Sequence, residues 1–287
     1  MEGIKKNTGA FFDKNNLREI ISVLKKLANR IYALHSRSKE DFAIINQHLK
    51  NCHKILKNIN QFIPQVKEKT AECSTWFAKI ITDLQYQDII NQKIDHIQRT
   101  LQELIDELEL LDQNFEQTHI HIRAKAYLRS RDIIGLQAAQ LIYANKQYRS
   151  SLDNIVKNFK KVNEIIETIV PILKINTEIS SKISELINNS DLDFLNYVFF
   201  DSTCEAFIDG INDINMKLNA DFDNNETISK EENLKQLKEK YTMDSEHLIH
   251  ELILKSEEGN MYLFDNEDGI INLNEKKKDN DENLELF

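Results

Sequence analysis

Two polar side chains four residues apart, Asp88 and Gln92, could do chemistry together if they stand on a helix. They lie in the stretch 84–99, whose apolar residues recur at steps of three and four and therefore predict an amphipathic helix. At about 100° per residue, both side chains fall opposite the apolar seam, one above the other. A carboxylate in that position can pair with a cation on a partner, and an amide can orient a water molecule. An ordinary solvated helix face would show the same pattern, so this second interpretation stays open.

The residues around the pair are Tyr86-Gln87-Asp88-Ile89-Ile90-Asn91-Gln92. This string resembles the active-site segment of the CheZ-type chemotaxis phosphatases, in which an aromatic-Gln-Asp is followed by a Gln four residues after the Asp. The resemblance implies that Asp88 engages the active-site lysine of a phosphorylated, CheY-like response regulator. It also implies that Gln92 positions the water that attacks the phospho-aspartate, and that Tyr86 and Gln87 contact the regulator. The chain departs from the family at 90–91, where Ile-Asn replaces a small Thr-Gly pair.

The same resemblance has implications for cofactors, partners and the C-terminal end. No metal or other cofactor is expected on this chain, because the regulator brings its own Mg²⁺. The family pairs two hairpins into a four-helix bundle, so a homodimer is one expectation and a monomer with four helices is another. The acidic end at 279–287 contains the apolar residues Leu284, Leu286 and Phe287, and is similar to the short C-terminal segment with which the family docks on its regulator.

The composition predicts an all-α protein, an elongated antiparallel helical hairpin or four-helix bundle of coiled-coil type. Only 6 glycines and 2 prolines occur in 287 residues, so few positions interrupt helix formation. The expected organisation is a flexible start at 1–15, a bundle over 16–218, and an acidic part at 219–287 with one helix at about 230–255 and a mobile tail. The bundle helices are predicted at about 17–61, 70–115, 117–188 and 192–218, with a turn at Gln113-Asn114. Pro64 predicts a break and Pro171 a kink. Gly135 predicts close packing or a kink.

The charge is unevenly distributed, and this narrows the classes of partner. The net charge is −10. Residues 219–287 contain 19 acidic and 8 basic side chains, whereas residues 1–218 contain 28 acidic and 29 basic side chains. A nucleic-acid partner is not expected, because no basic region dominates. No apolar run is long enough to span a membrane, and the first residues lack a hydrophobic signal core, so a cytoplasmic location is expected. The three cysteines lack metal-site spacing, which also favours a reducing compartment.

Two other functions remain open at this point. A non-catalytic helical scaffold or adaptor of a bacterial signalling complex would need the same long amphipathic helices. A histidine phosphotransfer bundle would use a histidine such as His48. A second acidic pair, Asp201 and Glu205, has the same four-residue spacing as Asp88 and Gln92, and either is a degenerate second site or belongs to a solvated face. Serine hydrolases, P-loop enzymes and dinucleotide-binding folds have no supporting motif in the sequence.

Overall fold

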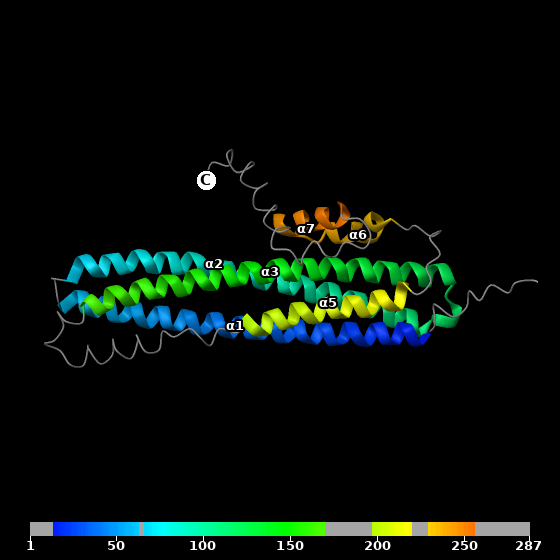
Figure 1. Ribbon diagram of the computed structural model, residues 1–287, viewed down its shortest axis with the longest axis horizontal. Coiled ribbons are helices and arrows are strands. Elements are labelled where there is room, and N and C mark those ends of the chain that lie inside the picture. Colours follow the sequence, from blue (N-terminus) through cyan, green and yellow to red (C-terminus); the bar gives the residue numbers. More distant parts are fainter. Residues whose placement is uncertain (1–13, 63–65, 170–196, 220–228, 256–287) are drawn as a thin grey trace, which may run out of the picture. The chain divides into compact units, whose positions relative to one another are not determined.

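The computed structural model describes residues 14–62, 66–169, 197–219 and 229–255, and every element within them is helical (Figure 1). The elements are α1 (Lys14–Phe62), α2 (Lys67–Gln113), the short 3₁₀ helix η2 (Phe115–Gln117), α3 (Ile120–Ile169), α5 (Tyr197–Asn219), α6 (Lys230–Lys238) and α7 (Asp244–Lys255). No strand occurs in these ranges. The all-α prediction is therefore confirmed, and none of the described helices has an apolar stretch that could cross a membrane.

The chain forms two compact units, and four long helices contribute a segment to each. Within the described residues, unit 1 comprises 14–24, 103–142, 207–219 and 229–255, and unit 2 comprises 25–62, 66–102, 143–169 and 197–206. The stretch with Asp88 and Gln92 belongs to unit 2, and the pair α6–α7 belongs to unit 1.

The core of unit 2 contains the seam that the spacing predicted. Ile90, Ile94 and Ile97 of α2 are fully buried. Tyr148 of α3 is also buried, with its ring 5.8 Å from that of Phe42 on α1 and 5.2 Å from that of Phe200 on α5. These aromatic contacts join three helices in a single layer of the core.

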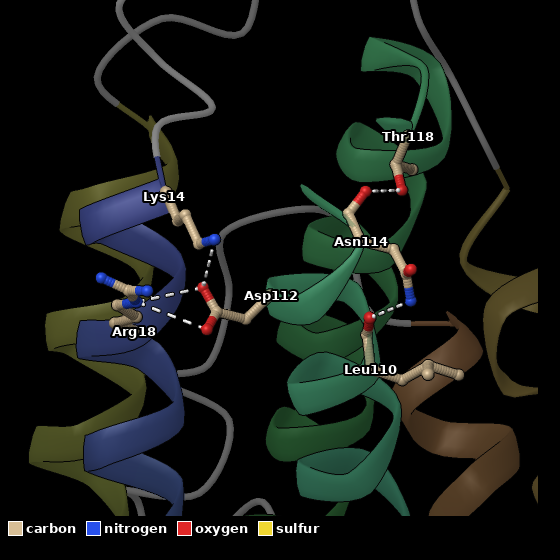
Figure 2. A network of polar contacts seen from close by, with 6 residues as sticks. All are labelled: Lys14, Arg18, Leu110, Asp112, Asn114 and Thr118. Carbon is tan, nitrogen blue, oxygen red and sulfur yellow. Dashed lines mark hydrogen bonds and ion pairs between the residues drawn. The ribbon is translucent and has the colours of Figure 1, made fainter. Parts of the chain in front are cut away.

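The turn between α2 and α3 lies in unit 1 and begins where the sequence predicted it. α2 ends at Gln113, and the Asn114 side chain donates a 2.9 Å hydrogen bond to the carbonyl oxygen of Leu110, one of the last carbonyls of α2 (Figure 2). The Thr118 hydroxyl donates in turn to the carbonyl oxygen of Asn114, at 2.8 Å. Both carbonyls also accept a backbone hydrogen bond, Leu110 from the N–H of Asn114 at 3.2 Å and Asn114 from the N–H of Gln117 at 3.0 Å, so the side chains add a second bond to each carbonyl of the turn.

An acidic residue near the end of α2 ties this helix to the start of α1. The Asp112 carboxylate lies 3.1 Å from Nε of Arg18 and 3.9 Å from Nζ of Lys14 (Figure 2). Both cations are partly exposed, so these ion pairs contribute little stability individually. They mark the turn of α1 that lies beside the end of α2.

The prediction of one helix over about 230–255 is wrong, because two helices occupy this range. α6 begins at the predicted cap, where the backbone N–H of Glu232 donates to the Ser229 hydroxyl at 3.1 Å. It ends at Lys238, and α7 begins at Asp244. The buried carboxylate of Glu246 accepts from the backbone N–H groups of Thr242 and Met243, at 3.1 and 3.2 Å, so it caps a new helix start.

Several predicted breaks fall beyond what the structure describes. Pro64, Pro171, the predicted turn at 188–190 and the start of the predicted fourth helix are all outside the described residues. Within them, α3 starts at Ile120 instead of about 117, because η2 occupies 115–117.

Gly135 lies inside α3, and the expectation of close packing there is wrong. The helix continues through it, and a Cβ added at this position would meet no atom within 4 Å. Gly135→Ala should therefore stabilise the protein by about 0.5–1 kcal/mol, because alanine loses less backbone freedom on folding. Urea unfolding monitored by circular dichroism measures this change. A lower unfolding midpoint for the variant would show that the position tolerates only glycine.

Candidate functional site

The structure places Asp88 and Gln92 on the exposed side of α2, one helical turn apart. Both side chains are exposed, while Ile90 and Ile94 on the opposite side are fully buried. Among the described residues, neither Asp88 nor Gln92 makes an ion pair or a side-chain hydrogen bond. Their polar atoms are therefore hydrated, and a partner would not have to break an internal contact to reach them.

The two positions that depart from the phosphatase string do not lie on this exposed side. Ile90 is fully buried in the seam. The side-chain oxygen Oδ1 of Asn91 is also buried, and has no hydrogen-bond partner within the described ranges. The extra bulk of the Ile-Asn pair is thus directed into the protein, away from the surface that contains Asp88 and Gln92.

The flanking residues Tyr86 and Gln87 differ in exposure. Tyr86 is 43% exposed, whereas Gln87 is half-buried. Tyr86 lies close enough to Tyr143 of α3 to affect it: burial raises the pKa of the Tyr143 phenol, and Tyr86 raises that pKa further. Tyr86 therefore lies on the side of the exposed Asp88–Gln92 pair that is nearest to α3.

Lys93, directly after Gln92, is a buried cation that sequence reasoning missed. It is only 2% exposed, and its ammonium donates to the amide oxygen of Gln147 on α3. The ammonium also lies 4.5 Å from the centre of the Tyr143 ring, a cation–π distance. The Gln147 amide donates to the Tyr143 hydroxyl at 3.3 Å. These contacts hold α2 against α3 and set which side of α2 faces water.

Polar contacts also hold α2 on either side of the candidate segment. Before it, the Ser151 hydroxyl donates to the backbone carbonyl of Asp83 at 2.9 Å, and the Asn158 amide donates to the Asp83 carboxylate at 3.2 Å. Burial raises the pKa of the Asp83 carboxyl, and the hydrogen bonds from the Asn158 and Asn154 side chains oppose this effect. After the segment, the Asp95 carboxylate lies 3.1 Å from Nδ1 of His35 on α1. The helix segment that contains Asp88 and Gln92 is thus fixed to two neighbouring helices.

Two exposed isoleucines flank the polar pair and were also missed. Ile81 is 50% exposed and Ile89 is 36% exposed. Helical geometry places them on the same side as the exposed residues Gln85, Asp88 and Gln92. The sequence feature that could have identified them is that neither isoleucine belongs to the apolar seam. We call this set, Ile81, Gln85, Asp88, Ile89 and Gln92, the α2 face.

His35 makes the stability of unit 2 dependent on pH. Burial lowers the pKa of its imidazole below the ordinary value of 6.5, and the Asp95 carboxylate only partly opposes this. Below about 6.5 the unfolded chain then binds more protons than the folded chain at this site, so stability is present above this pH and falls as the pH drops through it. His35→Gln should therefore lose less stability than the wild type between pH 7.5 and 5.5, measured by urea midpoints. Equal losses of stability in the variant and the wild type would exclude His35 as the source of the pH dependence.

The second acidic pair is not equivalent to the first. The Asp201 carboxylate accepts a 2.8 Å hydrogen bond from Asn145 and forms an ion pair with Arg149, both on α3. Glu205 is exposed. Asp201 thus holds α5 against α3 in unit 2, and this favours a structural role over a second site.

The remaining candidate residues are only partly described. His48 is half-buried on α1. Leu284, Leu286 and Phe287 lie outside the described residues. In the described part of the chain, no three histidine, cysteine or acidic side chains are grouped as metal ligands would be.

No family model, curated protein or solved structure matches this chain. The likeness to the phosphatases therefore depends on the residues at 86–92 and on the acidic segment with apolar residues at 279–287, which lies outside the described residues.

Proposed function

We propose that this protein accelerates the dephosphorylation of a phospho-aspartyl response regulator in chemotaxis or related two-component signalling. The observation that supports this most is the arrangement of Asp88 and Gln92. They stand one turn apart on the exposed side of a helix that is fixed to its neighbours, and neither is engaged within the described residues. A cytoplasmic location follows from the proposal, because response regulators act there.

The chemistry needs few groups from this chain. The regulator brings the phosphoryl group and its Mg²⁺, and positioning with electrostatic stabilisation accounts for most of the catalysis of phosphoryl transfer. The Asp88 carboxylate would pair with the regulator's lysine. The Gln92 amide, which has both a donor and an acceptor, would hold the attacking water in line with the phosphorus.

The scaffold that we propose is an elongated antiparallel four-helix bundle of coiled-coil type, as a monomer or a homodimer. Its support is that α1, α2, α3 and α5 each contribute segments to both compact units. The segment with Leu284, Leu286 and Phe287 is proposed as a second contact that tethers the regulator and raises its local concentration.

The two isoleucines of the α2 face should set how tightly the regulator binds. Replacing Ile81 and Ile89 together by serine should raise the regulator concentration for half-maximal activity about 30-fold, because burial of each exposed isoleucine on binding would contribute about 1 kcal/mol, and about 1.4 kcal/mol corresponds to a tenfold change in affinity. The saturated rate should change little. Phosphate release measured at increasing regulator concentration gives both quantities.

A matched control is available on another helix of unit 2. Ile44 of α1 is 40% exposed, between the exposures of Ile81 and Ile89. Ile44→Ser should leave the half-maximal concentration unchanged. If it had the same effect as the α2 changes, general loss of apolar surface would explain the result and the α2 face would not be the contact.

The proposal is tested by mixing the purified protein with a panel of chemically phosphorylated response regulators and following phosphate release. Faster release with at least one regulator is the expected result. Binding of a phosphorylated regulator with no acceleration would favour the non-catalytic scaffold or adaptor instead.

A further inference from the structure

The exposed side of α1 in unit 2 contains a stripe of lysines. At about 100° per residue, ten exposed positions between 25 and 57 fall within about 80° of one another around the helix. Five of them are lysines and none is acidic. We call this set the lysine stripe, and its members are Lys25, Asn29, Tyr32, Ser36, Lys39, Ala43, Gln47, Lys50, Lys54 and Lys57.

Charge is unevenly distributed within unit 2. Residues 25–57 contain eight lysine or arginine side chains and two acidic ones, whereas the other described residues of this unit contain ten of each kind. One of the two acids, Asp41, is buried, and its carboxylate accepts a hydrogen bond from the Tyr148 hydroxyl. The positive excess of the described part of unit 2 therefore lies entirely on α1.

Four lysines of the stripe lack a partner of opposite charge. Among the described residues, no ion pair involves Lys39, Lys50, Lys54 or Lys57. The last three follow one another at steps of four and three, so their ammonium groups are neighbours on the helix surface. Like charges at this spacing destabilise a helix, and together they attract an anion that contacts several of them at once.

The stripe also includes one exposed aromatic side chain. Tyr32 is 66% exposed and lies between Lys25 and Lys39 along the stripe. An amphipathic ring of this kind can contact apolar groups while its hydroxyl stays in water. A partner with both acidic and apolar side chains would therefore match the stripe better than a purely anionic one.

The complementary composition occurs in this chain at 256–287, a segment outside the described residues. It contains ten acidic and three basic side chains, together with apolar and aromatic ones such as Leu263, Phe264 and Phe287. It directly follows α7, and 32 residues can reach over about 105 Å when fully extended. The 49 residues of α1 are only about 74 Å long, so the segment has ample reach.

We propose that the lysine stripe is a docking surface for the acidic segment 256–287 of the same chain. Its carboxylates pair with the stripe lysines, and covalent connection raises their local concentration to about the millimolar scale. Each pair is exposed and weak, so docking needs several pairs and is opposed by salt. The inference does not rest on the proposed phosphatase activity, although a regulator bound to this segment would compete with the stripe for it.

Carbodiimide cross-linking of the full chain tests this, because it joins an amine to a carboxylate only where the two are in contact. Mass spectrometry should find the segment 256–287 linked to Lys50, Lys54 or Lys57. These links should be at least about fivefold more abundant than links to Lys157 and Lys160, exposed lysines of α3 that have acidic neighbours four residues away. Raising the salt from about 0.1 M to about 1 M should reduce them about threefold or more, as the Debye length falls.

A mixture of ¹⁵N-labelled and unlabelled chains identifies the source of the segment. Links within one chain contain a single isotope, and this is the expected result. Links that combine the two labels as often as random pairing would show that a second copy supplies the segment, and would overturn the proposal.

A charge-reversal variant separates docking on the stripe from chance collisions. Replacing Lys50, Lys54 and Lys57 together by glutamate should reduce the links between the segment and the unchanged Lys39 about threefold or more, because the docked segment loses most of its partners. The control, Lys157→Glu with Lys160→Glu, should leave the links to Lys39 unchanged. Circular dichroism should show wild-type helix content in both variants, since all these side chains are exposed or solvated. Links to the stripe no more abundant than those to α3, or no response at Lys39 to the triple change, would overturn the proposal.

Discussion

Gln92→Ala is expected to slow the stimulated dephosphorylation on the order of 100-fold, while the affinity for the phosphorylated regulator changes little. The reason is that an amide that orients the attacking water contributes chiefly in the transition state. Gln92 is exposed and makes no side-chain hydrogen bond with another described residue, so the substitution should change the free energy of unfolding by less than about 0.5 kcal/mol. Single-turnover phosphate release at saturating protein measures the rate, and binding to a stably phosphorylated mimic measures the affinity.

Two further variants on the same helix show whether the effect is specific. Gln85→Ala changes the same type of side chain on the α2 face, so it is expected to alter at most the binding of the regulator and to leave the rate at saturating protein unchanged. Asp88→Ala should weaken both binding and rate, because it removes the charge partner of the regulator's lysine. A wild-type rate in Gln92→Ala would rule out the assigned mechanism.

Tyr148→Ala is expected to destabilise the protein by about 3–5 kcal/mol, the largest stability change that we predict. The side chain is 2% exposed, its ring contacts Phe42 and Phe200, and its hydroxyl donates to the Asp41 carboxylate at 2.7 Å. Removing the ring leaves a cavity where α1, α3 and α5 meet. Urea unfolding monitored by circular dichroism measures the loss.

Two further tyrosine variants separate the contribution of the buried Tyr148 ring to stability from that of its hydroxyl. Tyr148→Phe keeps the ring and removes only the hydroxyl, so it should cost about 1–2 kcal/mol. Tyr32→Ala removes a tyrosine of α1 that is 66% exposed, and should change stability by less than about 0.5 kcal/mol. If Tyr32→Ala cost as much as Tyr148→Ala, burial of the Tyr148 ring would not be the cause of its effect.

The long helices were predictable because their apolar residues repeat at helical spacing with few interruptions. The seam residues Ile90, Ile94 and Ile97 are buried as expected, and α2 ends at Gln113, at the predicted turn Gln113-Asn114 and two residues before the predicted helix end. The break between α6 and α7 was not predictable from this pattern. It depends on the Glu246 carboxylate turning back to cap two backbone N–H groups, and the sequence there contains no proline or glycine to signal it.

The candidate site was predictable only in part, because some of its features depend on contacts between residues far apart in the sequence. The exposure of Asp88 and Gln92 follows from about 100° per residue along one helix. The burial of Lys93 does not, because it requires Gln147 and Tyr143, about fifty residues further along the chain, to lie beside α2. A lysine next to an exposed glutamine would ordinarily be assigned to solvent.

Phosphate release under multiple turnover, with about one protein molecule to ten of a phosphorylated response regulator, tests the proposed phosphatase activity most directly. Catalysis predicts that the whole regulator pool loses its phosphoryl group faster than it does alone, with an initial rate proportional to the protein concentration. An unchanged rate with every regulator that binds the protein would contradict the proposed phosphatase function.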